Sequence, residues 1–353
     1  MRAVVLTARF LFSANYLKVC YNKPYKTKTE DIMDYSQILS QQFNIKEEYA
    51  KNIITLLDDG NTIPFIARYR KEMHGSMDDQ LIREFAEKLE YLRGLDKRRD
   101  EIRSLIDAQE KLTDEINLAL DKAATLSELE DIYRPYRPKR KTRASIAKEK
   151  GLEPLANDIL KQEKGFDPSK SAVDYIDEEK GVTSVEDAIQ GAMDIIAELV
   201  SDNAEIRKRI RNLTNANGVL VSVATDEEKD SVYKNYYDYK EPVKKIAGHR
   251  VLAVNRGEKE GFLKVSVETD SEKPLNSIFR AMITDKNQLC SDIIREACTD
   301  AYQRLIYPSI EREVRNDLTD TASENAMKVF AVNLKQLLMQ PPVKGKTVLA
   351  LDP

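Results

Sequence analysis

The spacing of apolar residues along the chain predicts a mainly α-helical protein, and the first predicted helix covers residues 35–59. Its apolar residues recur at intervals of three and four, which places them on one face: Tyr49, Ala50, Ile53, Ile54 and Leu57. A longer helix follows from Ser76, where Asp79 would complete a pair resembling a capping box. Its apolar stripe consists of Leu81, Phe85, Leu89, Leu92, Ile102 and Ile106. Gly94 weakens this helix but need not end it.

The middle of the chain predicts several shorter helices and then a small β element. Helices are expected near 114–124, from Ser127 (with Glu130 as its capping partner) to just before Pro135, and from about 145 with a break at Gly151. Further helices are expected near 171–178, from Ser184 with Asp187 as its capping partner, and through Ile206, Ile210 and Leu213. Beyond Gly218 the apolar residues alternate, which is typical of strands. Strands are therefore predicted at 219–223, 251–255 and 262–267, with residues 256–261 as a glycine-containing hairpin loop.

Helical periodicity returns in the last third of the chain. One helix is predicted with Leu289, Ile293, Ala297, Ala301 and Leu305 on one face. A helix of some thirty residues follows over 309–340 and ties the helical layers together. Its apolar positions are Ile310, Val314, Leu318, Ala326, Val329, Phe330, Leu334 and Leu337. Pro341 and Pro342 would end it, and residues 348–351 form an apolar strand. Since a lone strand has no sheet to join, we expect this strand to open a further domain.

Composition and charge fit a soluble, charge-rich protein. The 353 residues suggest two or three domains, and charged residues make up 33% of them. Lys and Arg total 56 against 60 Asp and Glu, which gives a net charge of −4. This overall balance does not favour nucleic-acid binding, so any such surface must be a local patch.

The few cysteines and histidines do not form the motifs of common zinc sites or zinc hydrolases. Cys20, Cys290 and Cys298 form no CxxC pair, and they fit buried, reduced thiols in a cytosol. His74 and His249 lie far apart, so no HExxH motif exists. No GxSxG motif occurs either. We therefore expect no catalytic site, no metal site and no cofactor.

The N-terminal segment predicts neither a membrane anchor nor a clear secretory signal. No apolar run reaches the roughly 18–20 residues of a membrane span. Arg9 interrupts the first apolar stretch, and no clear cleavage site follows. Met33 is a candidate second initiator. Residues 1–32 are accordingly expected to be an extension outside the fold.

A basic segment, RPYRPKRKTR at residues 134–143, is the main candidate for function, and we call it the basic strip. It has no acidic residue, and its cations are Arg134, Arg137, Lys139, Arg140, Lys141 and Arg143. Phosphates attract such a cluster, and Tyr133 and Tyr136 could stack on bases. The alternative is a solvated loop, or one that pairs internally with acids such as Glu128 and Asp131.

A second basic cluster comprises Arg68, Arg70 and Lys71, beside Phe65 and Tyr69. It could present cations to nucleic acid. The alternative is a buried apolar anchor with solvated ends.

Two motifs near the C-terminus resemble parts of known sites but lack residues that those sites need. The GKT at 345–347 resembles part of a phosphate-binding loop, but Gln340 stands where that loop needs glycine. The segment also leads into a predicted strand rather than a helix. Asp352 follows that strand, as a metal-binding carboxylate does in nucleases with a ribonuclease-H-like sheet. This chain supplies no further carboxylates after it, so it cannot perform two-metal chemistry alone.

Several segments together resemble the Tex family of bacterial transcription accessory proteins. They are TIPFIARYRKE at 62–72, LSELEDIYRPYRPKRKTRASIAKEKGLEPLA at 126–156, YKEPVKKIAGHRVLAVNRGEKEGFLKV at 239–265, PSIEREVRNDL at 308–318 and QPPVKGKTVLALDP at 340–353. The resemblance covers about residues 34–353 in the family's order. It implies an N-terminal helical region with helix-turn-helix character, followed by ribonuclease-H-like, helix-hairpin-helix and S1 domains. In members of the family, nucleic-acid binding depends largely on the helix-hairpin-helix and S1 domains. This chain has neither of these domains.

The resemblance and the pattern together predict four regions. They are an extension over 1–32, a Tex-like N-terminal helical domain over 33–215, a mixed region with a β-hairpin and long helices over 216–340, and the truncated start of a ribonuclease-H-like domain over 341–353. In the family, the first strand of that domain corresponds to residues 347–351.

The predicted function is a non-enzymatic, cytoplasmic module of transcription that binds RNA or DNA through the basic strip. A first alternative is a scaffold that docks on RNA polymerase or the ribosome without touching nucleic acid. A second alternative is a nuclease, which would need acidic partners downstream of Asp352.

Overall fold

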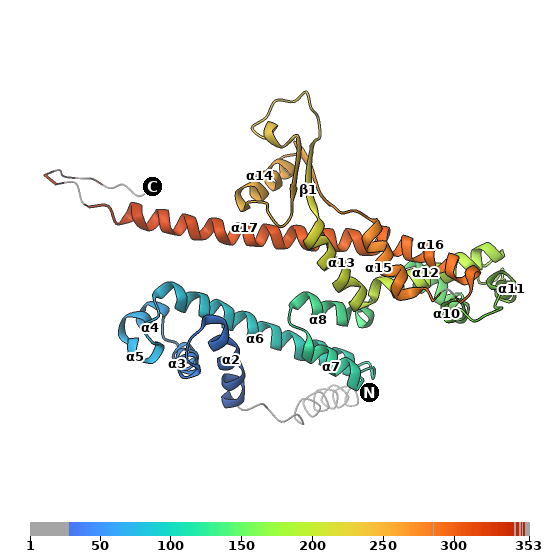
Figure 1. Ribbon diagram of the computed structural model, residues 1–353, viewed down its shortest axis with the longest axis horizontal. Helices are drawn as coiled ribbons and strands as arrows, with labels where there is room; N and C mark the ends of the chain where they lie inside the picture. The colour runs from blue at the N-terminus through green and yellow to red at the C-terminus, as the bar shows by residue number, and fades with distance from the viewer. Residues whose placement is uncertain (1–27, 285, 342–343, 346, 348, 350–353) are drawn as a thin grey trace, which may run out of the picture. The chain divides into compact units, whose positions relative to one another are not determined.

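The computed structural model describes residues 28–284, 286–341, 344, 345, 347 and 349 (Figure 1). The chain divides into two compact units, Met1–Leu126 and Ser127–Pro353, which we call unit 1 and unit 2. The described residues are mainly helical and carry one small antiparallel sheet, which confirms the predicted fold class. The domain boundaries expected at 33, 216 and 341 stay predictions.

Unit 1 is helical throughout its described part. Its helices are α2 (Lys28–Phe43), α3 (Glu47–Asp58), α4 (Ile63–Tyr69), α5 (Lys71–His74), α6 (Asp79–Asp107) and α7 (Asp114–Lys122). Leu39, Ile53, Ile66 and Phe85 are completely buried where α2, α3, α4 and α6 pack together.

The prediction of one helix over residues 35–59 is wrong, because the chain breaks between α2 and α3. Asn44 adopts a left-handed conformation with φ of 51°. The amide of Ile45 then donates to the carbonyl of Ser40 at 3.0 Å, which closes the end of α2. Asn tolerates this conformation better than most residues, and periodicity alone does not reveal it.

The long helix α6 does not begin as predicted from Ser76. Its cap is Asp78, whose side chain accepts from the amide of Leu81 at 2.8 Å. Ser76 has φ of 63° and follows Gly75 in a left-handed turn, so it lies outside the helix. Gly94 lies within α6, as predicted.

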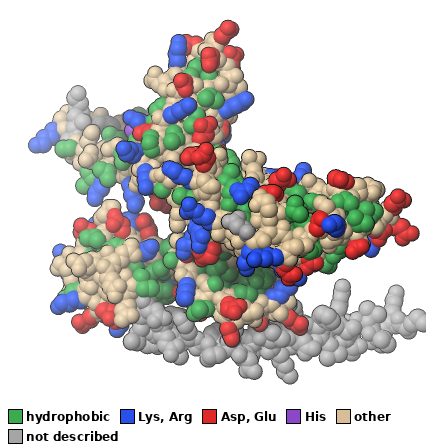
Figure 2. Space-filling model, turned by 45° about the vertical axis from the view of Figure 1, so that its right-hand side comes forward, with side chains coloured by type: hydrophobic (Ala, Val, Ile, Leu, Met, Phe, Trp, Pro, Cys, Tyr) green, Lys and Arg blue, Asp and Glu red, His purple; other side chains and the backbone are tan. Residues whose placement is uncertain are grey.

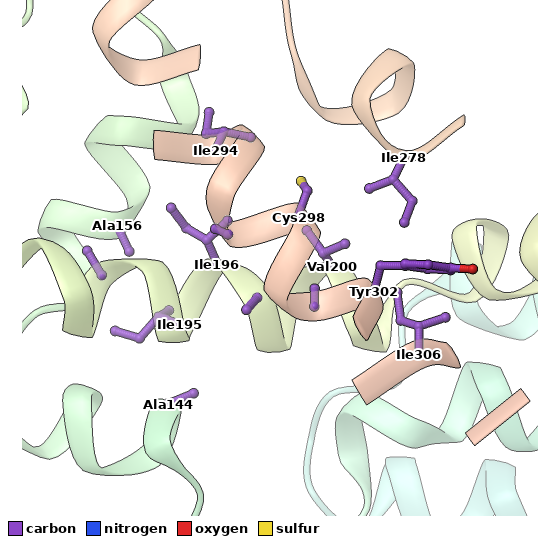
Figure 3. Close-up of a cluster of buried hydrophobic side chains, with 14 of the residues drawn as sticks. Ala144, Ala156, Ile195, Ile196, Val200, Ile278, Ile294, Cys298, Tyr302 and Ile306 are labelled. Atoms are coloured by element: carbon purple, nitrogen blue, oxygen red, sulfur yellow. The ribbon is translucent and has the colours of Figure 1, made fainter. Parts of the chain in front are cut away.

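Unit 2 is built around α12 (Val185–Asp202), whose predicted cap is confirmed by a hydrogen bond of 3.1 Å from the amide of Asp187 to the Ser184 hydroxyl. Against it pack α9 (Arg143–Glu149), α10 (Glu153–Lys161), α11 (Pro168–Ala172), η2 (Val173–Tyr175), α13 (Ala204–Asn217) and α16 (Gln288–Asp300). The unit also contains α8 (Leu126–Tyr133), a 3₁₀ turn η1 (Arg134–Tyr136) and α15 (Glu272–Met282). Figure 3 shows Ile196 and Val200 of α12 beside Ile294 and Cys298 of α16 in this core.

The sheet has the order β2-β1-β3, and both pairings are antiparallel. Its strands are β1 (Val219–Ala224), β2 (Asp238–Pro242) and β3 (Leu263–Glu268), with a 3₁₀ turn η3 (Lys234–Tyr236) before β2. The strands predicted at 219–223 and 262–267 are therefore confirmed.

The strand predicted at 251–255 is wrong, and so is the hairpin loop at 256–261. These residues belong to helix α14 (Gly248–Lys259) and the turn after it. Val251, Val254 and Gly257 are buried at a spacing of three, which is a helical face rather than a strand. A Cβ on Gly257 would lie 2.5 Å from a methyl of Leu263, so glycine allows α14 to pack closely on β3.

The outer edge of β3 is closed by side chains instead of a further strand. Val265 donates to Glu258 at 3.3 Å and accepts from Arg315 at 2.9 Å. Val267 donates to Glu311 at 3.0 Å and accepts from the Tyr307 hydroxyl at 2.8 Å. Because all four backbone groups are satisfied, this edge does not offer a free template for another strand.

The C-terminal helix α17 (Tyr307–Leu338) confirms the predicted long helix. A π-helical turn η4 (Ala301–Ile306) joins α16 to it. Pro308 near the start of α17 has no amide hydrogen, so the regular α-helical bond pattern cannot pass through it. The π turn lies directly before this proline.

Two predicted faces of these helices need correction. In α16 and η4 the predicted face is confirmed at Ala297 and Ala301, which are buried, but not at Leu289, which is exposed. Cys290, Ile294 and Cys298 are also buried, one position further along the helix. In α17 only Ile310, Val314 and Ala322 are buried. Five of the predicted stripe positions are exposed instead: Ala326, Val329, Phe330, Leu334 and Leu337.

The remaining predictions concern the ends of the chain. Helix α17 ends at Leu338, three residues before Pro341, so the proline pair does not itself terminate it. Of the strand expected at 348–351, three residues lie outside the described part, as do Cys20 and Asp352.

Candidate nucleic-acid interface

Pro135 at one end and a helix cap at the other determine the local structure of the basic strip. Helix α8 ends at Tyr133, and Pro135 lies in the following 3₁₀ turn, where its fixed φ is accommodated. Residues 137–142 then run without helical structure until Thr142 caps α9. The Thr142 hydroxyl accepts from the amide of Ser145 at 3.0 Å, and the Ser145 hydroxyl accepts from the amide of Thr142 at 2.8 Å. The strip is thus anchored by a helix at each end.

Two cations of the strip fold back onto carboxylates at the C-terminus of α12. Nε of Arg134 lies 3.3 Å from Asp202. Nζ of Lys139 lies 3.4 Å from Glu198 and also contacts Asp202. Both acids are largely shielded from solvent. These ion pairs therefore hold the strip against α12, whereas fully exposed pairs would contribute little.

The side chains of Arg134 and Lys139 are shielded to a similar degree, at 35% and 31% exposed. The pKa of Arg134 lies below the usual value, first because burial penalises the charged form and second because the positive charge of Arg207 acts in the same direction. The carboxylates of Asp202 and Asp131 oppose this shift. Arg134 therefore serves as an anchor of the strip and is poorly placed to meet a ligand.

The outward side of the strip carries Arg137, Arg140, Lys141 and Arg143, all of which are exposed. Lys141 lies 3.7 Å from Glu149, and both side chains are more than 60% exposed, so this pair contributes little. Among the described residues, Arg137, Arg140 and Arg143 form no ion pair. These three guanidinium groups are the strip's available charges. Tyr136 between them is half-buried and makes internal contacts.

Asp131 and Glu128, the acids expected from the sequence as internal partners, form their ion pairs with residues outside the strip. Asp131 binds Arg207 at 2.5 Å and Arg211 at 2.6 Å. Glu128 binds Lys208 at 2.8 Å. The partners that sequence reasoning missed, Glu198 and Asp202, lie some sixty residues downstream of the strip, and no local pattern pointed to them.

The second basic cluster lies in unit 1, on α4 and α5. Arg68 and Lys71 are exposed and form no ion pair with other described residues. Arg70 places its guanidinium 5.2 Å from the centre of the Phe65 ring and donates to the carbonyl of Tyr69 at 3.2 Å. Buried Ile66 holds this segment to the core. The anchor and the exposed cations predicted from the sequence thus occur together.

Charges of both signs are mixed over the protein surface. Figure 2 shows Lys and Arg side chains interspersed with Asp and Glu side chains over the visible face. Within the described part of the chain, no group of three or more His, Cys, Asp or Glu side chains could hold a metal ion. No described helix is long and apolar enough to cross a membrane.

Two family models match this chain. Residues 33–107 match a model described as the Tex-like protein N-terminal domain, and residues 163–330 match one described as Tex central region-like. The basic strip lies between the two matched segments, whereas the cluster at 68–71 lies within the first.

Relatives from bacteria and from humans align with most of the chain. Protein YdcI of Bacillus subtilis is 44% identical over 328 residues, which cover 91% of this chain and 46% of the relative. Transcriptional accessory protein Tex of Neisseria gonorrhoeae is 36% identical, with 91% and 43% covered. S1 RNA-binding domain-containing protein 1 of Homo sapiens is 31% identical, with 93% and 34% covered. The chain thus spans less than half the length of each of these relatives.

Proposed function

The chain belongs to the Tex family, and from this premise we propose that it is a non-enzymatic module of transcription that binds RNA or DNA through the basic strip. Two relatives are named for transcriptional accessory activity and for an S1 RNA-binding domain, which supports a role near nucleic acid. The observation that carries the proposal is the outward group of Arg137, Arg140 and Arg143, which have no ion pair with described residues.

The structure sorts the strip's cations into two roles. Arg134 and Lys139 are engaged with Asp202 and position the strip. The three outward arginines and weakly paired Lys141 would contact phosphates. Phosphate contacts of this kind provide affinity without reading sequence, so we expect little base preference from them. Arg68, Arg70 and Lys71 of unit 1 are proposed as a second, smaller contact surface.

A triple substitution tests this proposal: Arg137→Ala, Arg140→Ala and Arg143→Ala. Loss of three phosphate contacts should weaken binding of a labelled RNA or DNA oligonucleotide by about 10- to 100-fold at ~0.1 M salt. Filter binding or fluorescence anisotropy measures the affinity.

The matched control replaces three exposed arginines of unit 2 that lie outside the strip: Arg209, Arg280 and Arg312. It removes the same charge and should change affinity only slightly. Equal losses in the two triple variants would show a general charge effect and would contradict a role for the strip.

An alternative function as a protein-docking scaffold is favoured by one observation. The C-terminal part of α17 exposes large apolar side chains, among them Met327, Val329 and Phe330, each more than 60% exposed. Apolar surface of this kind is typical of protein interfaces. Recovery of RNA polymerase or ribosomes in a pull-down after nuclease treatment would support the scaffold, and recovery that requires intact nucleic acid would oppose it.

We also propose a cytoplasmic location, in keeping with transcription and with two thiols that are buried and unpaired. Cys290 and Cys298 are both free and buried. Free cysteines are usual in reducing compartments.

A further inference from the structure

A hollow of about 270 Å³ lies beside the basic strip, between α9, the turn at Gly181 and α12. Ile146 and Leu152 provide apolar surface, and Asp187 and Asp194 line the side formed by α12. Arg143 and Lys150 supply positive charge. The volume is slightly below the roughly 300–1,000 Å³ of typical ligand sites, which favours a small occupant.

The strip and the hollow lie on one face of α12. Gln190, Asp194, Glu198 and Asp202 follow one another at intervals of four residues, which places them in a row along that helix. The last two hold the strip, and the first two line the hollow. At 1.5 Å per residue, the row is about 18 Å long. Arg143 belongs to both features, because it is the last cation of the strip and also lines the hollow.

The charges in the hollow balance, which disfavours an anion as its occupant. Three of its polar side chains already have partners. Lys150 donates to the carbonyl of Gly181 at 2.7 Å, Asp187 accepts from the Thr183 hydroxyl at 2.5 Å, and Asp194 accepts from Arg304 at 3.5 Å. Gln190 is exposed and makes no hydrogen bond with another described residue. Its amide can donate and accept at once, as the edge of a base requires.

We propose that this hollow receives one unpaired nucleobase of a strand whose phosphates lie along the basic strip, with Gln190 bonding to the edge of the base. The inference rests on the proposed function and narrows its substrate to nucleic acid with an unpaired base. A base is planar, uncharged and partly apolar, which matches a neutral hollow with Ile146 and Leu152 in its wall.

A second, larger hollow is lined mainly by charged and polar side chains, which suit a base less well. About 510 Å³ lies between α14, β3 and α17. There Glu258 and Arg315 bind each other and the edge of β3, and Glu311 binds the amide of Val267. A ligand would have to displace these bonds.

The test compares Gln190→Leu, which keeps the size of the side chain, with Gln303→Leu as the control. Gln303 is exposed and lies outside the hollow. The loss of one or two hydrogen bonds should weaken binding of a single-stranded oligonucleotide by about three- to tenfold in the first variant. Binding of an oligonucleotide with the same backbone but abasic sugars should not change. The salt dependence should also stay unchanged, since no phosphate contact is lost.

The outcomes separate this inference from the function on which it rests. An equal loss on normal and abasic strands, or no loss at all, would overturn the base-binding hollow while leaving the strip intact. Absence of binding by the unaltered chain would overturn the proposed function itself. Ile146→Ala provides a second variant, expected to act in the same direction by removing apolar contact with the base.

Discussion

Asp131 is the residue on which the buried charges of unit 2 converge. It is 4% exposed and binds Arg207 and Arg211, while Arg211 also binds Glu313 of α17 at 2.6 Å. These contacts connect α8, which leads into the basic strip, to α13 and α17. One nitrogen of Arg207 already lacks a hydrogen-bond partner among the described residues.

Asp131→Asn should therefore lower the free energy of unfolding by about 3 kcal/mol or more, because two buried arginines lose their shared carboxylate. Urea denaturation measures this change. Asp158→Asn is the control, since its pair with Lys161 is largely exposed and should contribute less than about 1 kcal/mol. A similar effect of the two substitutions would show that the Asp131 network is not important for stability.

Cys298 makes stability depend on pH at the alkaline end. Burial raises the pKa of this thiol to about 12, well above its value in the unfolded chain. Its contribution is thus complete below the unfolded pKa of about 9 and is lost as pH rises toward 12. Between pH 8 and 11, the native chain should lose about 2.5 kcal/mol more stability than Cys298→Ala, at about 1.4 kcal/mol for each pH unit above the unfolded pKa. Parallel pH profiles from denaturant titrations would contradict this.

The sequence predicted Ser76 as the cap of α6, but the cap is Asp78, two residues later. Asp78→Ala should cost about 1 kcal/mol of stability, because its side chain bonds to the amide of Leu81. Ser76→Gly should be neutral or slightly stabilising, because Ser76 has a positive φ that glycine adopts freely. Thermal unfolding of the two variants distinguishes the observed cap from the predicted one.

Other elements show when the spacing of apolar residues is enough to predict secondary structure and when it is not. Helices α6, α12 and α17 are long enough that their apolar repeats predicted them directly. The short apolar run from Val251 to Val254 fits either a strand or a buried helix, and packing against β3 decides for the helix. The left-handed conformation of Asn44 between α2 and α3 concerns one residue, so the spacing of apolar residues cannot predict it.

At the scale of the whole molecule, a net charge of −4 conceals a local excess of positive charge. The sequence predicted this excess at residues 134–143, because composition and prolines are local properties. It did not predict that Arg134 and Lys139 would be held by α12, since that depends on contacts across some sixty residues. It also gave no signal for the hollow at Gln190, which only the packing of α9 on α12 creates.

The salt dependence of nucleic-acid binding tests the central claim most directly, because it counts the phosphates that the protein neutralises. The account predicts that the slope of log affinity against log salt becomes shallower by about 2 to 3 when Arg137, Arg140 and Arg143 are replaced by alanine. An unchanged slope in that variant, or affinity that does not vary with salt in the native chain, would contradict it.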